Sequence, residues 1–396
     1  MANLLRETPN NFIRKAVFLE GMKKLFWCVQ QLDRLGGTET VSISLMNLLC
    51  EDFEVTLICT SKEEGERLYA IDPRIKIVNL GLPSELGRFD QYWALYGQQH
   101  KPFKRLGLLN KAMGAYVFGR RKTQKKIRAL LDEDSFLIAS SLDSYLNAPK
   151  KTKAKVFFHY HFDGPYFEKD RAGMRFARKP DRYVFLTDTT LKQVAAKHKE
   201  IGAISSYVYN PVKFEGRPNF DFHGGKIIFV GRFTEQKDPL LALAIAKRLH
   251  DDGCPFTLTM YGDGHLKQAM ENYIDENGLT EVSLVSGVSI GQTHYLESDM
   301  LLITSEWEGL PLVKGEANAC SLPVITRDFQ GSIRETFLEG IDGHIIEGTD
   351  PAPYAAVIEN LLLHPDNLVE AKKKAFDGSK RFASEAIKAK WLEILR

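Results

Sequence analysis

The feature that most constrains the fold is an alternation of strand-like and helix-like runs, which occurs in two successive blocks. In the first half, the strand-like runs LFWCVQ and FEVTLICT flank GGTETVSISLMNLLC, which predicts a turn and a helix. The second half repeats the pattern with KIIFVG, PLLALAIAKRLHDDG and FTLTMYG. Strands that alternate with helices form parallel sheets covered on both faces. The sequence therefore predicts an α/β chain with two doubly wound domains.

The domain boundary is expected in a segment of little periodicity. Asn210–Gly225 is rich in Gly, Pro and Asn and predicts the linker. We expect the first domain at 22–208 and the second at 209–377, since 396 residues suit two cores better than one. Residues 1–21 precede the first convincing strand and are either an amphipathic extension or an addition upstream of the domain.

Composition excludes several classes of protein. The formal net charge is only +2, and the five cysteines are scattered without a CxxC pair. This disfavours a polyanion binder, a disulfide framework and a zinc site, and it favours a reducing cytosol. No stretch reaches the ~18 apolar residues of a membrane span, and the first residues lack a signal-peptide core.

Two common nucleotide and hydrolase motifs are also absent from the sequence. There is no GxxxxGK[ST] and no HExxH motif. The stretch Tyr261–His265 (YGDGH) has two of the glycines of a dinucleotide fingerprint but not the third. Metal-dependent, hydrolase and NAD-binding functions therefore lose most of their support.

Residues 101–128 form a basic stretch, with ten Lys or Arg, no Asp or Glu, and interleaved apolar residues. One interpretation is a solvated helix with an apolar face toward the core. The other is a basic amphipathic segment that lies on an anionic membrane, where Arg120, Arg121, Lys125 and Lys126 would bind. No recognised nucleic-acid module is present.

Two glutamates, Glu308 and Glu316, have seven residues between them and lie on either side of a predicted strand-to-helix turn. The strand is expected to end at Ser305, and the helix begins near Leu312. The free amides of Leu312 and Val313 would then suit a phosphate, and the carboxylates would accept hydrogen bonds from sugar hydroxyls. An E-x7-E spacing alone is common, so the surrounding residues carry the prediction of a nucleotide-sugar site.

The run FVGRFTEQKDP places two cations after a strand. Arg232 and Lys237 can neutralise a pyrophosphate leaving group there. Alone they are more simply two exposed cations, but the glutamate pair in the same predicted domain favours the site.

Two further candidates lie in the first domain. Gly36 and Gly37 follow a strand, where glycines let the backbone approach a ligand, although such a pair is more often a turn. His159 and His161 stand near the end of the strand KVFFHYHF, where alternation places both on one face. Each of them is as easily a packed histidine as a ligand contact.

Together these motifs resemble those of the retaining glycosyltransferases of the GT-B fold, in the large group 1 (family four) class. The resemblance covers most of the chain from Met22 and is strongest in SEWEGLPLVKGEANACSLPVITRD and FVGRFTEQKDPLLALAIAKRL. GGTE resembles the glycine loop of the family, MYGDGHLKQAM its G-x-G step, YNPV the opening of the second domain, and FASEAIKAKWLEIL its closing helix.

The resemblance implies a GT-B fold, with two Rossmann-like domains facing across a cleft and a C-terminal helix, 378–396, returning to the first domain. It also implies roles for individual residues. Glu308 faces the transferred sugar and Glu316 the ribose, while Arg232 and Lys237 hold the pyrophosphate. The remaining residues expected to bind the donor are Gly36, Gly37, Gly309, Leu310, Leu312 and Val313.

Two features depart from the family pattern. The stretch DFQGSIRE keeps Gly331 and Glu335 but has Gln330 where a glycine is usual, which changes the expected loop shape. The first-domain histidine of the family is usually single, and we favour His161 as the catalytic one because it is nearer the strand end.

The resemblance thus predicts a retaining, metal-independent hexosyltransferase with a nucleotide-sugar donor, UDP being the expected nucleotide, and no further cofactor. The expected acceptor is a cell-surface or lipid-linked glycan, reached from the cytoplasm at the inner face of the membrane, and no nucleic acid is expected as a partner. Alternatives are a non-catalytic GT-B partner subunit, a nucleotide-sugar epimerase or a phosphorylase. Retention of Arg232, Lys237, Glu308 and Glu316 favours the enzyme.

Overall fold

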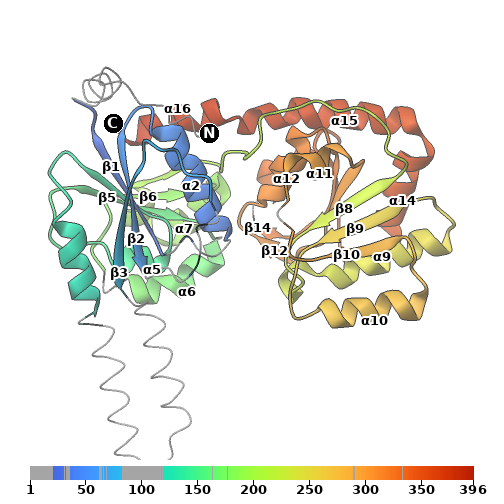
Figure 1. Cartoon of the computed structure of the whole chain (residues 1–396), viewed down its shortest axis with the longest axis horizontal. Coiled ribbons are helices and arrows are strands. Elements are labelled where there is room, and N and C mark those ends of the chain that lie inside the picture. Colours follow the sequence, from blue (N-terminus) through green and yellow to red (C-terminus); the bar gives the residue numbers. More distant parts are fainter. Residues whose placement is uncertain are drawn as a thin grey trace, which may run out of the picture. The chain divides into compact units, whose positions relative to one another are not determined.

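The computed structural model describes residues 21–30, 32, 36–61, 65, 67, 69–82, 117, 119–162, 164–175, 177–288, 290–331 and 333–396. Two large parallel β-sheets with accompanying helices form its framework (Figure 1). The predicted extension at 1–21 lies outside the described residues except for Gly21.

The first sheet has seven strands in the order β3-β2-β1-β4-β5-β6-β7. The strands are β1 (Lys24–Val29), β2 (Glu54–Ser61), β3 (Lys76–Leu82), β4 (Phe136–Ala139), β5 (Lys155–Tyr160), β6 (Arg182–Phe185) and β7 (Ser205–Tyr207). The helices are α2 (Gly37–Leu49), α5 (Leu142–Leu146), α6 (Gly164–Met174), α7 (Asp188–Lys197) and α8 (Lys199–Gly202). Every residue of β1 after Lys24 is buried, as expected for a central parallel strand covered on both faces.

The second sheet has six strands in the order β10-β9-β8-β11-β13-β15. The strands are β8 (Lys226–Val230), β9 (Thr257–Tyr261), β10 (Val282–Val285), β11 (Met300–Ile303), β13 (Val324–Arg327) and β15 (Gly343–Ile346). The helices are η1 (Glu235–Lys237), α9 (Pro239–Asp251), α10 (Lys267–Asn277), α11 (Gln292–Leu296), α12 (Leu312–Ala319), α13 (Ile333–Thr336), α14 (Pro351–Leu363), α15 (Pro365–Ser379), η2 (Lys380–Phe382) and α16 (Ser384–Ile394).

Alternate residues of β8 belong to two separate cores on opposite faces of the second sheet. Ile227 and Phe229 pack with residues of α9 and α14 in one cluster. Ile228 packs in the other cluster with residues of α11, α12 and α13. Figure 1 shows α9 and α10 running along strands β8 to β10. Two buried faces explain why β8 has the apolar sequence KIIFV.

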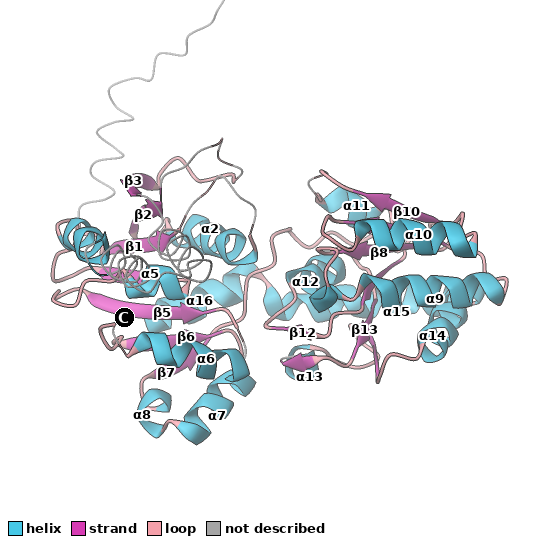
Figure 2. Ribbon diagram, turned by 90° about the horizontal axis from the view of Figure 1, so that it is seen from below, coloured by secondary structure: helices cyan, strands magenta, loops and turns pink. Residues whose placement is uncertain are grey.

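A small third sheet pairs β12 (Trp307–Glu308) with β14 (Gln330–Gly331). Glu308 lies opposite Gly331 in this pairing. The pairing brings the loop after β11 beside the loop after β13, and Figure 2 shows β12 close to α13, which follows β14. The loop after β11, which carries Glu308 and is called the glutamate loop below, is therefore held by backbone hydrogen bonds.

The predicted fold class is confirmed, because both sheets are parallel and have the strand order of doubly wound domains. The strand that was expected to end at Ser305 ends at Ile303. The strand predicted to include both histidines ends at Tyr160, so only His159 lies within it. Alternation therefore does not place His161 on a strand face with His159, and that expectation was wrong.

By compactness the chain divides into two units. The first contains residues up to Tyr160 with Lys169–Val184 and Leu395, and the second contains His161–Glu168, Phe185–Ile394 and Arg396. The predicted boundary at 208 and 209, the cleft between the domains and the return of 378–396 to the first domain stay predictions.

Candidate active site

The candidate site lies at the point where the strand order of the second sheet reverses. In open α/β sheets, ligands bind there, outside the carboxyl ends of the strands. This point is between β8 and β11, which pair directly. The loop after β8 carries Arg232 and Lys237, and the loop after β11 carries Glu308. The predicted residues thus leave neighbouring strands at the same edge of the sheet.

Gly262 allows the loops after β8 and β9 to cross closely. A Cβ atom on Gly262 would lie 1.9 Å from the carbonyl oxygen of Gly231. The amide of Gly231 donates to the carbonyl of Tyr261 at 3.0 Å, and the amide of Phe233 donates to that of Asp263 at 2.8 Å. The G-x-G step after β9 therefore has a steric cause, which is the direct backbone contact with the loop that carries Arg232.

Gln236 connects the loop after β8, which carries Arg232 and Lys237, to the glutamate loop. Its side-chain amide donates to the carbonyl of Trp307 at 3.1 Å, while its side-chain oxygen accepts from Arg232 Nη2 at 2.8 Å. The amide of Glu306 donates to the carbonyl of Gln236 at 2.9 Å. Arg232 is therefore oriented by a neighbour that also fixes the backbone next to Glu308.

Thr304 makes a second link between these loops, and it is fully buried. Its hydroxyl lies 2.9 Å from the carbonyl of Lys237 and 2.7 Å from that of Asp238. Asp238 has a positive φ of 45°, and its side chain caps α9 by accepting from the amide of Leu241. The backbone at Lys237 is thus held from both sides.

Glu308 and Lys237 form an ion pair at the centre of the site. Glu308 is 8% exposed, and its Oε1 also accepts a hydrogen bond from the hydroxyl of Ser305 at 2.8 Å. The structure thus brings together two residues that are 71 positions apart in the sequence. Both were predicted to contact a nucleotide-sugar.

The amino end of α12 follows this loop directly in the sequence, and Pro311 is the N-cap residue of the helix. Among the described residues, no side chain caps the helix. The first amides of a helix have no partner within it, so those of Leu312 and Val313 are left to water or to a ligand. Together with the positive end of the helix dipole, they provide an anion site of the predicted kind.

Glu316, one turn further along α12, is half-buried and accepts a hydrogen bond from the hydroxyl of Tyr295 at 2.7 Å. Burial raises the pKa of Glu316, while the Tyr295 hydrogen bond and the charge of Lys213 act in the opposite direction. The carboxylate is thus held in one orientation on the same helix as the proposed phosphate site.

The segment after β5 reaches the glutamate loop. A Cβ on Gly309 would lie 2.6 Å from the carbonyl oxygen of His161, and the ring centroid of Tyr166 lies 4.7 Å from that of Trp307. Burial lowers the pKa of His161 to about 3, so its imidazole is neutral at physiological pH. His159 is instead a core residue, 1% exposed, whose ring meets Trp27 edge-on.

Gly36 and Gly37 lie in the first unit, at the start of α2. Gly36 is the N-cap residue, and its amide donates to the hydroxyl of Tyr69 at 2.9 Å. A Cβ on Gly37 would meet nothing within 4 Å. Their proposed contact with a donor phosphate stays a prediction.

The sequence did not single out Gln236, Ser305 or Tyr295. Gln236 and Ser305 stand within four residues of predicted site residues, so their position was a usable signal. Tyr295 is 21 residues from Glu316 and on a different helix, so only the tertiary structure connects them.

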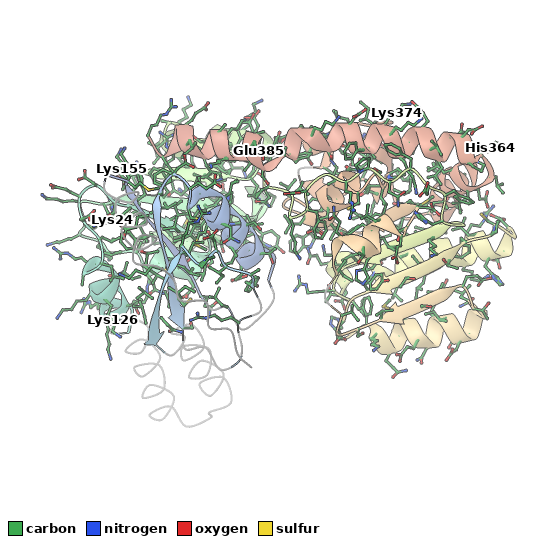
Figure 3. The ribbon with its side chains drawn as sticks, turned by 45° about the horizontal axis from the view of Figure 1, so that its top comes forward. Lys24, Lys126, Lys155, His364, Lys374 and Glu385 are labelled. Atoms are coloured by element: carbon green, nitrogen blue, oxygen red, sulfur yellow. The ribbon has the colours of Figure 1, made fainter. Side chains whose placement is uncertain are left out.

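Part of the predicted basic segment can be located. Residues 101–116 and 118 lie outside the described residues, and 119–128 are helical. Arg120 is buried, with its guanidinium on the carbonyl of Leu146 at 2.6 Å, so its predicted surface role is wrong. Lys126 is exposed at the surface of this helix and donates to the carbonyl of Leu80 at 3.1 Å (Figure 3).

In the part of the chain that the structure describes, no helix has both the length and the apolar character to cross a membrane. Within the same residues, no group of three or more His, Cys, Asp or Glu side chains is arranged to hold a metal ion.

Comparison with known proteins places these observations in a family. A model of the family "Glycosyl transferases group 1" matches residues 217–377, which include Arg232, Lys237, Glu308 and Glu316. The chain is 25% identical, over 94% of its length and 98% of the relative, to an alpha-1,4-N-acetyl-D-galactosaminyltransferase of Campylobacter jejuni. It is also 25% identical, over 94% of its length and all of the relative, to the amylovoran biosynthesis glycosyltransferase AmsD of Erwinia amylovora.

The fold is also similar to that of solved glycosyltransferases. A crystal structure of S. aureus TarM, in complex with Fondaparinux, alpha-GlcNAc-glycerol and UDP, superposes with a TM-score of 0.77 at 15% identity, covering 95% of this chain and all of TarM. Residues 217–377 therefore match the group 1 glycosyl transferases, and the chain as a whole has the GT-B fold of the solved glycosyltransferases.

Proposed function

We propose that this glycosyltransferase moves a hexose from a UDP-sugar to a hydroxyl of a glycan acceptor, with retention of the anomeric configuration and without a metal ion. The observation that carries the proposal is the meeting of Lys237, Glu308 and the uncapped amino end of α12 at the switch point of the second sheet. Cations, free amides and carboxylates in one place match the phosphate and hydroxyl groups of a nucleotide-sugar.

The diphosphate would bind between the amides of Leu312 and Val313 and the side chains of Arg232 and Lys237. Hydrogen-bond donors and cations that are fixed before the reaction stabilise the charge that grows on a leaving group. Glu308 would accept hydrogen bonds from the transferred sugar and Glu316 from the ribose. Two fixed cations in the site support a leaving-group role that needs no metal.

The proposed reaction breaks the bond between the anomeric carbon and the β-phosphate oxygen and forms one from the same face to the acceptor oxygen. The acceptor proton passes to the departing phosphate, so no separate base is needed. A neutral His161 beside the glutamate loop suits this chemistry, because an imidazolium would repel the positive charge that develops on the sugar ring.

The proposed acceptor is a lipid-linked or cell-surface glycan at the cytoplasmic face of the membrane. The C. jejuni relative is named for an undecaprenol-linked glycan, and AmsD is named for the biosynthesis of amylovoran. Five cations on the helical run 119–128 are exposed, namely Arg121, Lys122, Lys125, Lys126 and Arg128. They support contact with an anionic membrane surface.

The test is to incubate the purified chain with single UDP-sugars and a short polyprenyl-diphosphate-linked glycan in the presence of EDTA. We expect UDP release that depends on the acceptor, and proton NMR of the product should show the same anomeric configuration as the donor. Inverted product would refute retention. Activity restored only by a divalent cation would refute metal independence, and no transfer with any donor would favour a partner-subunit role.

A further inference from the structure

A buried lysine lies between the two glutamates of the candidate site and has no part in the function proposed above. Lys314 is the third residue of α12 and is 2% exposed. Its ammonium donates to Asp342 Oδ2 at 2.7 Å and to the carbonyl of Thr336 at 2.9 Å. It also lies 4.7 Å from the ring centroid of Phe382.

Asp342 already has another cationic partner. Arg381 Nη1 donates to Asp342 Oδ1 at 3.0 Å, and Arg381 Nη2 pairs with Oδ2. The amide of Leu338 donates to the same carboxylate at 2.9 Å. One anion therefore meets two cations, and the cluster Lys314–Asp342–Arg381 carries a net positive charge.

This excess charge is costly for the fold. A buried ion pair barely compensates the desolvation of its two charges, and a third charge without its own partner adds to that cost. Asp342 and Arg381 would be balanced without Lys314. Stability of the fold therefore does not explain why α12 carries a lysine at this position.

The position of Lys314 near the start of α12 suggests a role for its charge. Lys314 lines a small hollow together with Leu310, Pro311 and Leu312, which form the turn into α12. The side chain of Lys314 starts in the first turn of α12 and ties that turn to Asp342, just before β15, and to the carbonyl of Thr336 in α13. A positive charge buried against this short helix adds to the positive potential of the helix dipole at the amino end of α12.

We propose that Lys314 is a positioning residue for the donor diphosphate: its buried ammonium holds the first turn of α12 in place and adds positive potential where the phosphates bind. The proposal rests on the proposed function, since it requires a diphosphate at α12. It assigns to Lys314 an effect on nucleotide affinity that is separate from the stability of the fold.

The protonation of Lys314 provides a way to see this effect. Burial lowers its pKa to about 8, with the nearby charge of Arg381 acting in the same direction and Asp342 opposing it. The other groups that face the ammonium are a backbone carbonyl from α13 and the rings of Phe337 and Phe382. Above about pH 8 the ammonium loses its proton, so wild-type affinity for a diphosphate should fall.

Stability should change in the opposite direction. Because the folded pKa of Lys314 lies below its ordinary value of 10.5, the unfolded chain binds more protons between about pH 8 and 10.5. The contribution of this group to the free energy of unfolding therefore rises with pH in that range. A loss of affinity at alkaline pH would consequently not reflect unfolding caused by Lys314.

A second buried lysine offers a matched control. Lys372 on α15 pairs with Asp299 Oδ1 at 3.0 Å, and these side chains are 1% and 0% exposed. Asp299 precedes β11, so this pair lies at the amino ends of the strands, opposite the candidate site. Among the described contacts, Lys372 is the one cation that Asp299 pairs with, so losing it leaves a buried charge.

The experiment measures UDP affinity by titration calorimetry, together with melting temperature, for the full chain at pH 7.0 and pH 9.0. At pH 7.0 we expect Lys314→Met to weaken UDP binding about tenfold, the size of one charge acting over a few helical turns at an effective dielectric constant of about 20. Its melting temperature should be unchanged or higher. Lys314→Arg should restore the affinity, and Lys372→Met should lower the melting temperature while UDP affinity stays normal.

The change from pH 7.0 to pH 9.0 separates a charge effect from a packing effect. Wild type should lose affinity by about the same factor, and Lys314→Met should lose much less. The protonation of UDP changes with pH in the same way for both proteins. The ratio of their UDP affinities therefore isolates the effect of Lys314. Equal affinity of wild type and Lys314→Met at both pH values would overturn the proposal. Failure of wild type to bind UDP would instead contradict the proposed function.

Arg381→Met keeps the proposal testable if Lys314→Met does not fold. It leaves Lys314 and Asp342 as a balanced pair, and removing the like charge raises the pKa of Lys314. The alkaline loss of UDP affinity should then move to higher pH than in wild type. An unchanged midpoint would overturn the proposal.

Discussion

At the scale of single residues, the central feature is an ion pair between two residues that are expected to bind the nucleotide-sugar. Lys237 and Glu308 form an ion pair, and Ser305 holds the carboxylate by a further hydrogen bond of 2.8 Å. A bound nucleotide-sugar would have to replace this pair, with phosphate taking Lys237 and a sugar hydroxyl taking Glu308. The pair thus keeps two charged groups satisfied and in place until the donor arrives.

Glu308→Gln should separate these two roles. We expect turnover to fall by about a hundredfold or more, because a contact to the reacting sugar is weakened. UDP lacks the transferred hexose that Glu308 would contact, so its affinity should be unchanged or higher because Lys237 is released from its ion pair. Steady-state kinetics and calorimetry measure the two quantities, with Ser305→Ala as a milder control that keeps the carboxylate. Near-normal turnover of Glu308→Gln would refute its role.

The hydrogen bond between Tyr295 and Glu316 predicts a pH effect. Burial raises the pKa of Glu316, and the Tyr295 hydroxyl counteracts this. In Tyr295→Phe the pKa of Glu316 should therefore rise further, so that the carboxylate is protonated at a higher pH.

UDP affinity measured between pH 5 and 7 should consequently decline earlier on acidification in Tyr295→Phe than in wild type. Glu316→Gln, which cannot titrate, is the control and should lack this decline. Coincident pH profiles of UDP affinity for wild type and Tyr295→Phe would show that binding of the ribose does not depend on a charged Glu316.

At the scale of elements, the close crossing of the loops after β8 and β9 depends on glycine. A Cβ on Gly262 would overlap the carbonyl oxygen of Gly231 at 1.9 Å, and neither backbone can move without disturbing its strand. We expect Gly262→Ala to lower the free energy of unfolding by about 3 kcal/mol. Chemical denaturation measures this effect.

Gly173→Ala in α6 is the matched control, because its new Cβ would meet Leu142 at an ordinary 3.9 Å. Alanine is favoured over glycine within a helix, so this variant should be slightly more stable than wild type. Equal stabilities of Gly262→Ala and Gly173→Ala would mean that the crossing is looser than described.

Most of the second sheet was predictable from sequence, because its central strands are largely buried and alternate with helices. KIIFV became β8, and Pro239–Asp251 became α9 with Asp238 as its cap. The edge strand β3 and the short strand β7 were not predicted, since an edge strand and a three-residue strand leave only a weak pattern. The pairing of β12 with β14 depends on two loops meeting and has no local signal.

For the candidate site, local sequence was informative about which residues follow a strand and open a helix. Glu308, Lys237 and Arg232 were found in this way, and the structure brings their loops together. The partners Tyr295 and Asp342 could not be predicted, because each lies in another part of the fold more than 20 residues away. Arg120 was misassigned because a basic run does not reveal which of its members turns inward.

At the scale of the whole molecule, the net charge of +2 is too small to attract a membrane by itself, so any such attraction must come from a local patch. Lys122, Lys125 and Arg128 are exposed on one helical run. Replacing these three by Gln should weaken binding to anionic vesicles about a hundredfold, at about 1 kcal/mol for each cation near the surface. Vesicle co-sedimentation measures this loss of binding.

The control replaces the exposed Lys199, Lys373 and Lys374 by Gln, which makes the same change in net charge elsewhere. Vesicle binding of this variant should be close to that of wild type. Equal loss in both variants would mean that net charge, and not the helical run, is responsible. Equal binding to neutral and anionic vesicles would exclude an electrostatic surface.

The central claim is that a nucleoside diphosphate binds at the amino end of α12 between Lys237 and Glu316 without a metal. The measurement that tests it most directly is calorimetric titration of the full chain with UDP in the presence of EDTA, for wild type and Lys237→Met. We predict one UDP per chain for wild type and affinity weaker by about tenfold or more for the variant, since a charge-assisted hydrogen bond is lost. No binding to wild type, or equal binding to both proteins, would contradict the claim.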